Sequence, residues 1–272
     1  MNTPFHNIDG RILSAADRAM ELVKDKFCEI DDIQDYNTQK MLYAFQNAGI
    51  SESHFSTSTG YGFDDRGRDA LDKIYATVFD AEDALVRYNF VCGTHALTVA
   101  LFGMLRPGDT MLSVVGTPYD TLQSVIGLSG DYSGSLKDFG IIYDEVKLTP
   151  QGKPDYKAIE QAITPDLKMV YIQRSRGYDL RPSLLIDEIA RIAEIAKKKA
   201  PKTIVMLDNC YGEFVEKIQP LAVGVDIMAG SLIKNPGGGI APTGGYIAGR
   251  KDLVEQCAYR LTTPGIGKEQ GA

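Results

Sequence analysis

The chain has 272 residues, a formal net charge of −7, 44% hydrophobic residues and 24% charged residues. This composition is typical of folded globular proteins and excludes a disordered tail, a collagen-like repeat and a coiled-coil rod. No strongly basic segment is present, so we do not expect nucleic acid as a partner. The length fits either two domains or one large α/β domain.

The cysteines and histidines do not form a pattern that indicates a metal site or a disulfide framework. No C-x-x-C pair occurs, and the four cysteines are far apart in the sequence: Cys28, Cys92, Cys210 and Cys257. No apolar run reaches the roughly 18 residues of a membrane span, and the first ten residues contain no apolar signal core. We therefore expect a cytoplasmic protein with no metal and no membrane partner.

Apolar residues at helical spacing predict two amphipathic helices at the N-terminus, over residues 10–27 and 31–45. A polar, Gly-rich and aromatic stretch follows at residues 51–67, where we expect a functional loop. We assign residues 1–60 to an N-terminal helical arm.

The rest of the chain alternates between predicted strands and predicted helices. We expect strands at 84–89, 110–115, 141–146, 169–173, 204–208, 226–229 and 244–247, and helices at 68–79, 93–105, 154–163, 184–199 and 252–260, with a short helix after Tyr119. This alternation predicts a mostly parallel sheet covered on both faces, with ligands at the carboxyl ends of the strands. We assign residues 61–250 to one large domain. Residues 251–272 would begin a further domain, because the last ten residues resemble a cut loop.

The first candidate for function is Gly93, which lies between a predicted strand and a predicted helix. The helix N-terminus there would offer free backbone N–H groups to an anion. The alternative is a tight turn with Thr94 as the helix cap. A metal-binding role for His95 is not expected, since no second ligand lies at helical spacing.

The second and third candidates follow two later strands. Asp208 closes an apolar strand at the expected ligand-binding edge, where an unpaired carboxylate would be costly; the alternative is a helix cap. Lys234 lies in the Gly-rich loop 230–239. Partial burial would lower the pKa of its amine and allow it to form a Schiff base, whereas the alternative is a solvated loop lysine.

Taken together, an anion cradle, a strand-end Asp and a Lys 26 residues later resemble the fold type I pyridoxal-phosphate enzymes. Within that group, four strings are similar to the aluminium resistance proteins and methionine gamma-lyases of cysteine and methionine metabolism: GYGFDDRGR from Gly60, CGTHA from Cys92, IQRSRGY from Ile172 and KNPGGG from Lys234. The resemblance covers almost the whole chain. Cys92 departs from the pattern, because Ser usually precedes this glycine.

The resemblance implies a three-layer α/β/α large domain that binds pyridoxal 5'-phosphate. It implies that Lys234 holds the cofactor and removes the Cα proton, and that Asp208 pairs with the ring nitrogen. The phosphate would be bound by the backbone N–H groups of Gly93 and Thr94 and by the hydroxyl of Ser231. Tyr119 would stack on the ring and protonate the departing sulfur.

Two further groups of residues take roles from the same resemblance. Tyr61, with Arg66 or Arg68, would reach the phosphate of a neighbouring subunit in a homodimer or homotetramer. Arg174, Ser175 and Arg176 would contact the ring oxygen or the substrate carboxylate, with a solvated basic turn as the alternative. Family members continue into a small C-terminal domain that supplies the arginine for the substrate carboxylate, and that domain is absent here.

The function expected from the sequence is a pyridoxal-phosphate-dependent carbon–sulfur lyase of the methionine gamma-lyase or cystathionine beta-lyase type. Its products would be a keto acid, ammonia and a thiol. Two alternatives remain, an aminotransferase that uses the same cofactor and a non-catalytic module that only binds it.

Overall fold

The structure is a computed structural model that describes residues 7–62 and 64–270. Three parts of the sequence predictions lie outside the described residues. These are residues 1–6 of the expected arm, Phe63 of the Gly-rich loop, and residues 271–272 at the end of the chain.

A seven-stranded sheet forms the centre of the protein, in the order β1-β7-β6-β5-β4-β2-β3. Strand β7 is antiparallel to β1 and β6, whereas the other neighbouring pairs are parallel. The predicted mostly parallel sheet is therefore confirmed. Its strands are β1 (Asp83–Arg87), β2 (Thr110–Ser113), β3 (Ile142–Glu145), β4 (Met169–Gln173), β5 (Ile204–Asp208), β6 (Ile227–Ser231) and β7 (Gly245–Gly249).

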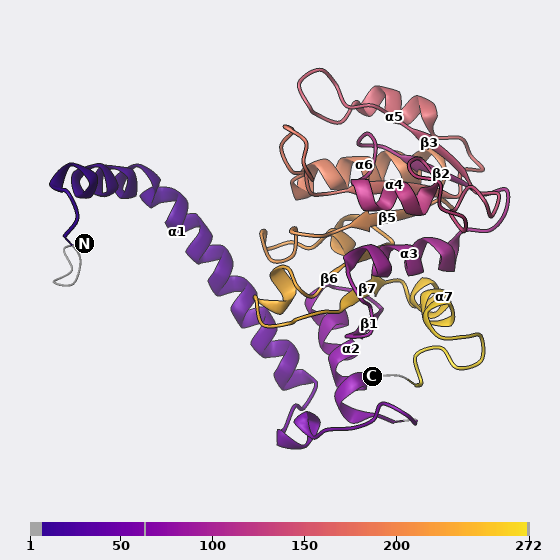
Figure 1. The fold of residues 1–272 in the computed structure, drawn as a ribbon, viewed down its shortest axis with the longest axis horizontal. Coiled ribbons are helices and arrows are strands. Elements are labelled where there is room, and N and C mark those ends of the chain that lie inside the picture. The colour runs from indigo at the N-terminus through magenta and orange to yellow at the C-terminus, as the bar shows by residue number, and fades with distance from the viewer. Residues whose placement is uncertain (1–6, 63, 271–272) are drawn as a thin grey trace.

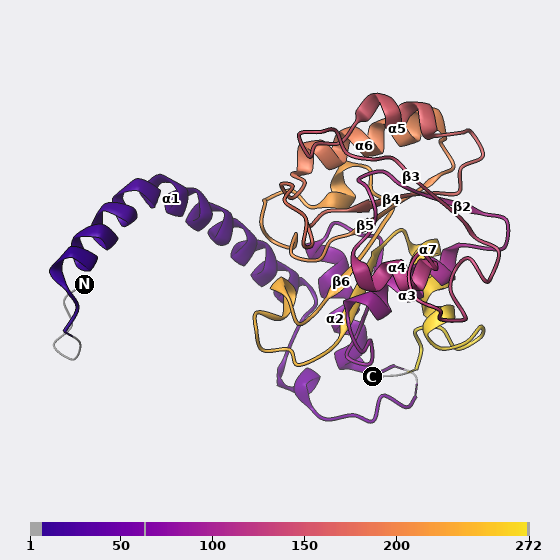
Figure 2. The ribbon, with the colours of Figure 1, turned by 45° about the horizontal axis from the view of Figure 1, so that its top comes forward.

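Helices cover both faces of this sheet and complete the three layers (Figures 1 and 2). Helices α3, α4 and α7 contribute to the apolar cluster on one face, and α2, α5 and α6 contribute to the cluster on the other. The helices are α2 (Arg66–Val78), α3 (Gly93–Met104), α4 (Asp120–Ile126), α5 (Tyr156–Ala162), α6 (Ile186–Lys199) and α7 (Lys251–Leu261). Short 3-10 turns occur at Glu52–Phe55, Pro220–Val223 and Asn235–Gly237.

Strand β5 shows why the central strands are apolar throughout. Val205 and Leu207 point into one cluster, and Ile204 and Met206 point into the other. Burial on both faces is worth roughly 1.5–3 kcal/mol for each large apolar side chain. The strand ends at Asp208, and the first polar side chain of this segment therefore lies at the carboxyl edge of the sheet.

The N-terminal segment forms one helix, α1 (Gly10–Asn47), and the prediction of two helices was wrong. The residues between the two predicted helices, Cys28 to Ile30, include neither Gly nor Pro, so nothing interrupts the backbone hydrogen bonds there. Helix α1 ends just before Gly49, which adopts a φ of +66°. Only Asn37 and Ala44 of α1 are buried, and its N-terminal half extends away from the body of the protein (Figure 1).

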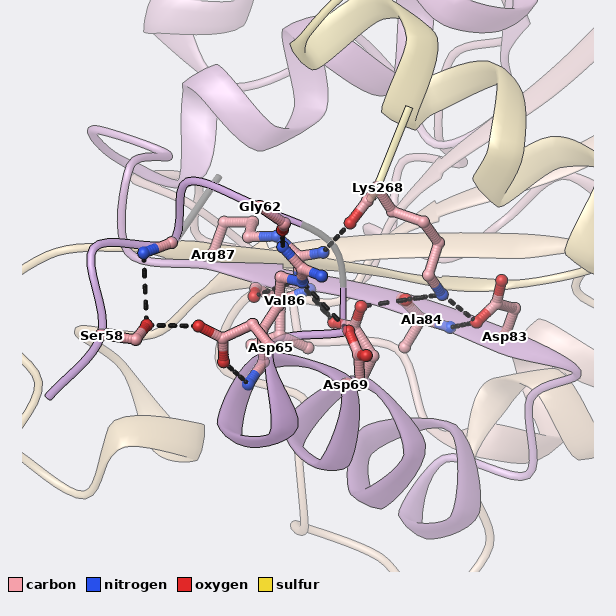
Figure 3. A network of polar contacts seen from close by, with 12 residues as sticks. Ser58, Gly62, Asp65, Asp69, Asp83, Ala84, Val86, Arg87 and Lys268 are labelled. Carbon is pink, nitrogen blue, oxygen red and sulfur yellow. Dashed lines mark hydrogen bonds and ion pairs between the residues drawn. The ribbon is translucent and has the colours of Figure 1, made fainter. Parts of the chain in front are cut away.

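A buried polar network joins α2, β1 and the segment that follows α7 (Figure 3). The Asp72 carboxylate accepts hydrogen bonds from Arg87 at 2.7 Å and from the backbone of Val86 at 2.8 Å, and both charged side chains are buried. Lys268 lies 3.6 Å from Asp72 and 2.6 Å from Asp83. Since a buried charge without its partner is costly, this network fixes the segment after α7 against β1.

Candidate functional site

A cavity of about 390 Å³ opens where β5 and β6 reach their carboxyl ends. Strand register places Gln173 of β4 beside Asp208, and Asp208 beside Ala229 of β6, so the loops that follow these strands meet at one edge. Seven residues selected from the sequence line the cavity: Gly93, Thr94, Tyr119, Ser175, Asp208, Ser231 and Lys234. The topology therefore brings together the three motifs selected from the sequence, which are centred on Gly93, Asp208 and Lys234.

Helix α3 begins at Gly93, on the wall of the cavity. Its N-cap residue is Cys92, and the Thr94 hydroxyl lies 2.7 Å from the Thr121 hydroxyl, so Thr94 is not the cap that the alternative required. His95 accepts a hydrogen bond from the backbone of Val91 at 3.2 Å, which gives this histidine a structural role.

The start of α3 is closely packed against Ser231. A Cβ atom at Gly93 would lie 3.0 Å from Ser231 Cβ and 3.5 Å from Cys210 Sγ, so only glycine leaves this space open. Ser231 is fully buried, and its Oγ has no hydrogen-bond partner within residues 7–62 and 64–270. A buried hydroxyl without a partner beside free helix N–H groups fits a bound phosphate.

The Asp208 carboxylate is buried and accepts a hydrogen bond of 3.0 Å from the backbone N–H of Cys210. Burial raises the pKa of Asp208, whereas its hydrogen bonds from Cys210 and the charge of Lys234 act in the opposite direction. The segment that follows is a turn, so Asp208 does not cap a helix. A cationic ring nitrogen would supply the positive partner that this desolvated carboxylate needs.

Lys234 is half-buried, lines the cavity, and has its Nζ 4.2 Å from the centroid of the Tyr211 ring. Burial alone would lower the pKa of this amine, but Cys210, Asp208 and Tyr211 together raise it above its ordinary value. The expected lowering of the Lys234 pKa was therefore wrong for the free amine. Of these three neighbours, the sequence analysis had selected only Asp208.

Tyr119 lines the cavity and is held by its backbone and its hydroxyl. Its backbone N–H donates to the Gln173 side chain at 2.6 Å, and its hydroxyl donates to the Tyr178 hydroxyl at 3.3 Å. The second bond is the main cause that raises the pKa of Tyr119 to about 12. Like an ordinary tyrosine, Tyr119 is neutral near pH 7, and the hydrogen bond to Tyr178 further favours its protonated form.

Arg174 does not line the cavity. Its guanidinium is buried and donates to the Gly212 carbonyl at 2.8 Å and to the Asn209 side chain at 3.0 Å, and it pairs with Glu216. Arg174 thus holds the turn that follows Asp208, and it is not the solvated basic residue of the alternative. Arg176 is exposed and lines a second groove of about 300 Å³ beside Tyr119.

The residues expected to act across a subunit interface lie outside the cavity of this chain, with Tyr61 on the loop before α2 and Arg66 and Arg68 in the first turn of α2. Tyr61 is 87% exposed, and Arg66 is exposed as well. Arg68 is buried; it donates to Asp69 at 3.0 Å and to the Gly62 carbonyl at 3.4 Å (Figure 3). The role of these residues in a neighbouring subunit stays a prediction.

Several residues with no role assigned from the sequence also line the cavity, among them Tyr178, Cys210 and Tyr211. Cys210 and Tyr211 directly follow the strand-end Asp208, and Tyr178 lies within the string that begins at Ile172, so their proximity to known candidates was the available signal. Tyr211 has a φ of +65°, which is unusual for a residue with a side chain and is often found at functional sites.

A buried acidic residue lies behind the cavity. Tyr246 donates a hydrogen bond of 2.8 Å to Glu213, and the Asn209 side chain donates to the Tyr246 hydroxyl at 3.3 Å. Burial raises the pKa of Glu213 to about 7, despite the hydrogen bond from Tyr246. The hydrogen bonds among Glu213, Tyr246 and Asn209 support the turn between Asp208 and Phe214.

The described residues include neither a cluster of metal-binding side chains nor a membrane-spanning helix. Over residues 7–62 and 64–270, no group of three or more His, Cys, Asp or Glu side chains is placed to hold a metal ion. None of the helices in this part of the chain is long and apolar enough to span a membrane.

Comparison with known proteins connects this site to an enzyme family. The family model described as methionine gamma-lyase matches residues 12–272. The uncharacterized protein YnbB of Bacillus subtilis is 52% identical over 245 residues, which cover 90% of this chain and 58% of YnbB. L-methionine gamma-lyase of Pseudomonas putida is 29% identical over 184 residues, or 66% of this chain and 39% of that enzyme.

Solved structures agree with this relationship. The crystal structure of a carbon–sulfur lyase involved in aluminum resistance from Clostridium novyi NT has a TM-score of 0.93 and 52% sequence identity. The match covers 97% of this chain and 63% of the Clostridium chain, so this chain spans less than two thirds of the length of such relatives. The chain belongs to the methionine gamma-lyase family, which is a family of fold type I pyridoxal-phosphate lyases.

Proposed function

We propose that this protein is a pyridoxal-phosphate-dependent carbon–sulfur lyase that acts on a sulfur-containing amino acid. The observation that carries the proposal is that Lys234, the buried Asp208 and the unpartnered hydroxyl of Ser231 belong to one cavity at the sheet edge. The family membership supports the cofactor and the lyase class. We place the protein in the cytoplasm.

The residues of the cavity would hold the cofactor at three points. The backbone N–H groups of Gly93 and Thr94 and the Ser231 hydroxyl would bind its phosphate, as expected for a helix N-terminus. Asp208 would pair with its ring nitrogen, and Lys234 would bind its aldehyde carbon. Bound in this way, pyridoxal phosphate supplies an electron sink for the carbanion formed at the substrate Cα.

The proton transfers would then fall to two side chains of this chain. The Lys234 amine would accept the proton from the substrate Cα, and the neutral Tyr119 hydroxyl would donate a proton to the departing sulfur. Tyr119 suits the second role because its side chain lines the cavity and, like an ordinary tyrosine, is protonated at neutral pH. Ser175 also lines the cavity and would contact the cofactor ring oxygen or the substrate.

Part of the site would come from a second subunit of a homodimer or homotetramer. The loop with Tyr61 is exposed and lies outside the cavity of its own chain, as expected for a residue that reaches a neighbouring site. Arg66 or Arg68, in the first turn of the helix that follows this loop, would accompany it to the phosphate.

Covalent attachment of the cofactor tests the proposal. The purified protein, saturated with pyridoxal phosphate, should absorb in the Schiff-base band, and borohydride should abolish this band. Peptide mapping should then find the reduced cofactor on Lys234. A label on Lys168 or Lys202 would contradict the proposal, and Lys202→Ala is the matched control that should leave labelling intact.

Product analysis separates the lyase from an aminotransferase and from a non-catalytic binding module. With cystathionine or methionine as substrate, the lyase releases keto acid and ammonia in equal amounts. Stoichiometric formation of glutamate or alanine from an added keto acid would identify the aminotransferase instead. A spectral change without any keto acid would identify the binding module.

A further inference from the structure

We propose that Tyr178 is a positioning residue that holds the phenol of Tyr119 in place on the wall of the cavity. This role rests on the proposed lyase function. Only the turnover measurement requires lyase activity, whereas the pKa of Tyr119 can be measured without it. Tyr178 lies on the loop after β4, whereas Tyr119 lies at the start of α4. Three independent contacts join these two segments.

The first contact is made by the side chain of Gln173, which is buried at the end of β4. Its Oε1 accepts the 2.6 Å hydrogen bond from the backbone N–H of Tyr119, and its Nε2 donates to the Ser175 carbonyl at 3.1 Å. One amide group thus connects the Tyr119 segment to the Tyr178 loop. Both ends of this amide are satisfied, which fixes the distance between the two segments.

The second contact depends on Gly177, the residue directly before Tyr178. Gly177 has a φ of +60°, and a Cβ atom there would lie 3.3 Å from Cδ2 of Tyr119 and 3.4 Å from Nε2 of Gln173. The loop backbone therefore passes close beside the Tyr119 ring, in a conformation that favours glycine. Buried Arg181 supports this loop, since it donates to the Ser175 carbonyl at 2.6 Å.

The third contact is between the two phenols themselves. The Tyr119 hydroxyl donates to the Tyr178 hydroxyl at 3.3 Å, and the ring centroids are 5.5 Å apart at an angle of 36°. Tyr178 is 83% exposed, so it contributes little to the core. A well-supported loop that places an exposed tyrosine against a cavity residue favours a role at the site over a role in folding.

This geometry gives Tyr178 a specific effect on the proton donor. By accepting a hydrogen bond, Tyr178 stabilises the protonated form of Tyr119 and orients its O–H group. Removal of the Tyr178 hydroxyl should therefore make Tyr119 easier to ionise and leave its ring free to rotate.

The test uses Tyr178→Phe in the full chain, which keeps the ring and removes the hydroxyl. Tyrosine labelled with ¹³C at Cζ reports ionisation by NMR without any bound cofactor, and Tyr119→Phe identifies the Tyr119 signal. We expect the pKa of Tyr119 to fall toward the ordinary tyrosine value near 10. Tyr132→Phe, which changes an exposed tyrosine outside the cavity, should leave the Tyr119 signal unchanged.

The second measurement is turnover by the cofactor-saturated protein. In Tyr178→Phe, kcat should fall roughly five- to tenfold, the rate equivalent of one hydrogen bond, with KM changed less. Gly177→Ala should shift the Tyr119 signal as well, because its Cβ would displace the ring. An unchanged Tyr119 pKa in Tyr178→Phe would overturn the inference. If the pKa falls but no lyase activity is found with any variant, the proposed function fails and the positioning role stands.

Discussion

The Nζ atom of Lys234 lies 4.2 Å from the centroid of the Tyr211 ring. An ammonium group over an aromatic face is stabilised by the negative potential of that face. Tyr211 reaches this place through a left-handed backbone conformation, with a φ of +65°, while its side chain remains 60% exposed. Tyr211, three positions after Asp208, therefore favours the charged form of the free lysine, together with Cys210 and Asp208.

Replacement of Tyr211 by leucine should lower the pKa of Lys234. A cation–π contact contributes roughly 0.5–2 kcal/mol, so the decrease should be about 0.4–1.5 in pKa. The pKa can be measured from the pH dependence of reductive methylation at Lys234, read by peptide mapping. Tyr211→Phe keeps the aromatic face and is the control. Equal pKa values in the Leu and Phe variants would show that the ring does not stabilise the ammonium.

Replacement of Asp208 by asparagine should leave the cofactor bound and slow the removal of the Cα proton. A neutral amide no longer favours a protonated ring nitrogen, and each loss of about 1.4 kcal/mol in transition-state stabilisation slows the step tenfold. Exchange of the substrate Cα proton in D₂O, followed by NMR at equal cofactor occupancy, measures this step. A rate within a few-fold of the unmodified protein would mean that Asp208 has only a structural role.

Replacement of Gly93 by alanine should weaken binding of the cofactor phosphate. The new Cβ would lie 3.0 Å from Ser231 Cβ and would fill the space beside the start of α3. We expect the Kd for pyridoxal phosphate to rise, while the weak binding of pyridoxal, which has no phosphate, changes much less. Gly10→Ala is the matched control, because a Cβ at Gly10 meets nothing within 4 Å. A parallel loss of affinity for both compounds would place the phosphate elsewhere.

Glu213 should make the stability of the protein depend on pH. Burial raises the pKa of its carboxyl from 4.5 to about 7, so the folded state binds a proton more tightly than the unfolded state does. The stabilising contribution is present in full below pH 4.5 and is lost as the pH rises through about 7. This increase in the Glu213 pKa corresponds to a loss of roughly 3 kcal/mol in the free energy of unfolding over that pH range.

The variant Glu213→Gln isolates this contribution, because glutamine keeps an acceptor for Tyr246 and does not titrate. Urea unfolding at pH 5 and pH 8 should show that the unmodified protein loses more stability between these values than the variant does. The difference between the two proteins removes the effect of all other titrating groups. If both proteins change equally, Glu213 is already ionised when folded.

The sequence was most informative where one strong physical constraint acts locally. Strands β4 and β5 were predicted at their observed bounds, because central strands of a parallel sheet are apolar on both faces. The sequence also predicted that Asp208 and Ser231 lie at one edge of the sheet, because the carboxyl ends of neighbouring parallel strands lie together. The helix pair expected before residue 47 was wrong because a change in the apolar pattern does not break a helix without Gly or Pro.

The remaining parts of the site depend on contacts between distant segments. Tyr178 reaches Tyr119 only because Gly177 adopts a positive φ and Gln173 bridges the two loops. The environment of Lys234 likewise depends on how the turn after Asp208 folds around Arg174. Neither effect leaves a periodic signal in the sequence, so the loops that complete the cavity could not be predicted in the way the strands were.

Helix α1 determines how the chain moves through solution. Its 38 residues form about 57 Å of helix, which bends along its length, and its N-terminal half extends away from the body (Figures 1 and 2). A single chain with this shape experiences more friction than a sphere of 29.8 kDa, so it sediments more slowly and elutes earlier from a sizing column than its mass suggests. A mass for this protein should therefore come from light scattering rather than from elution volume.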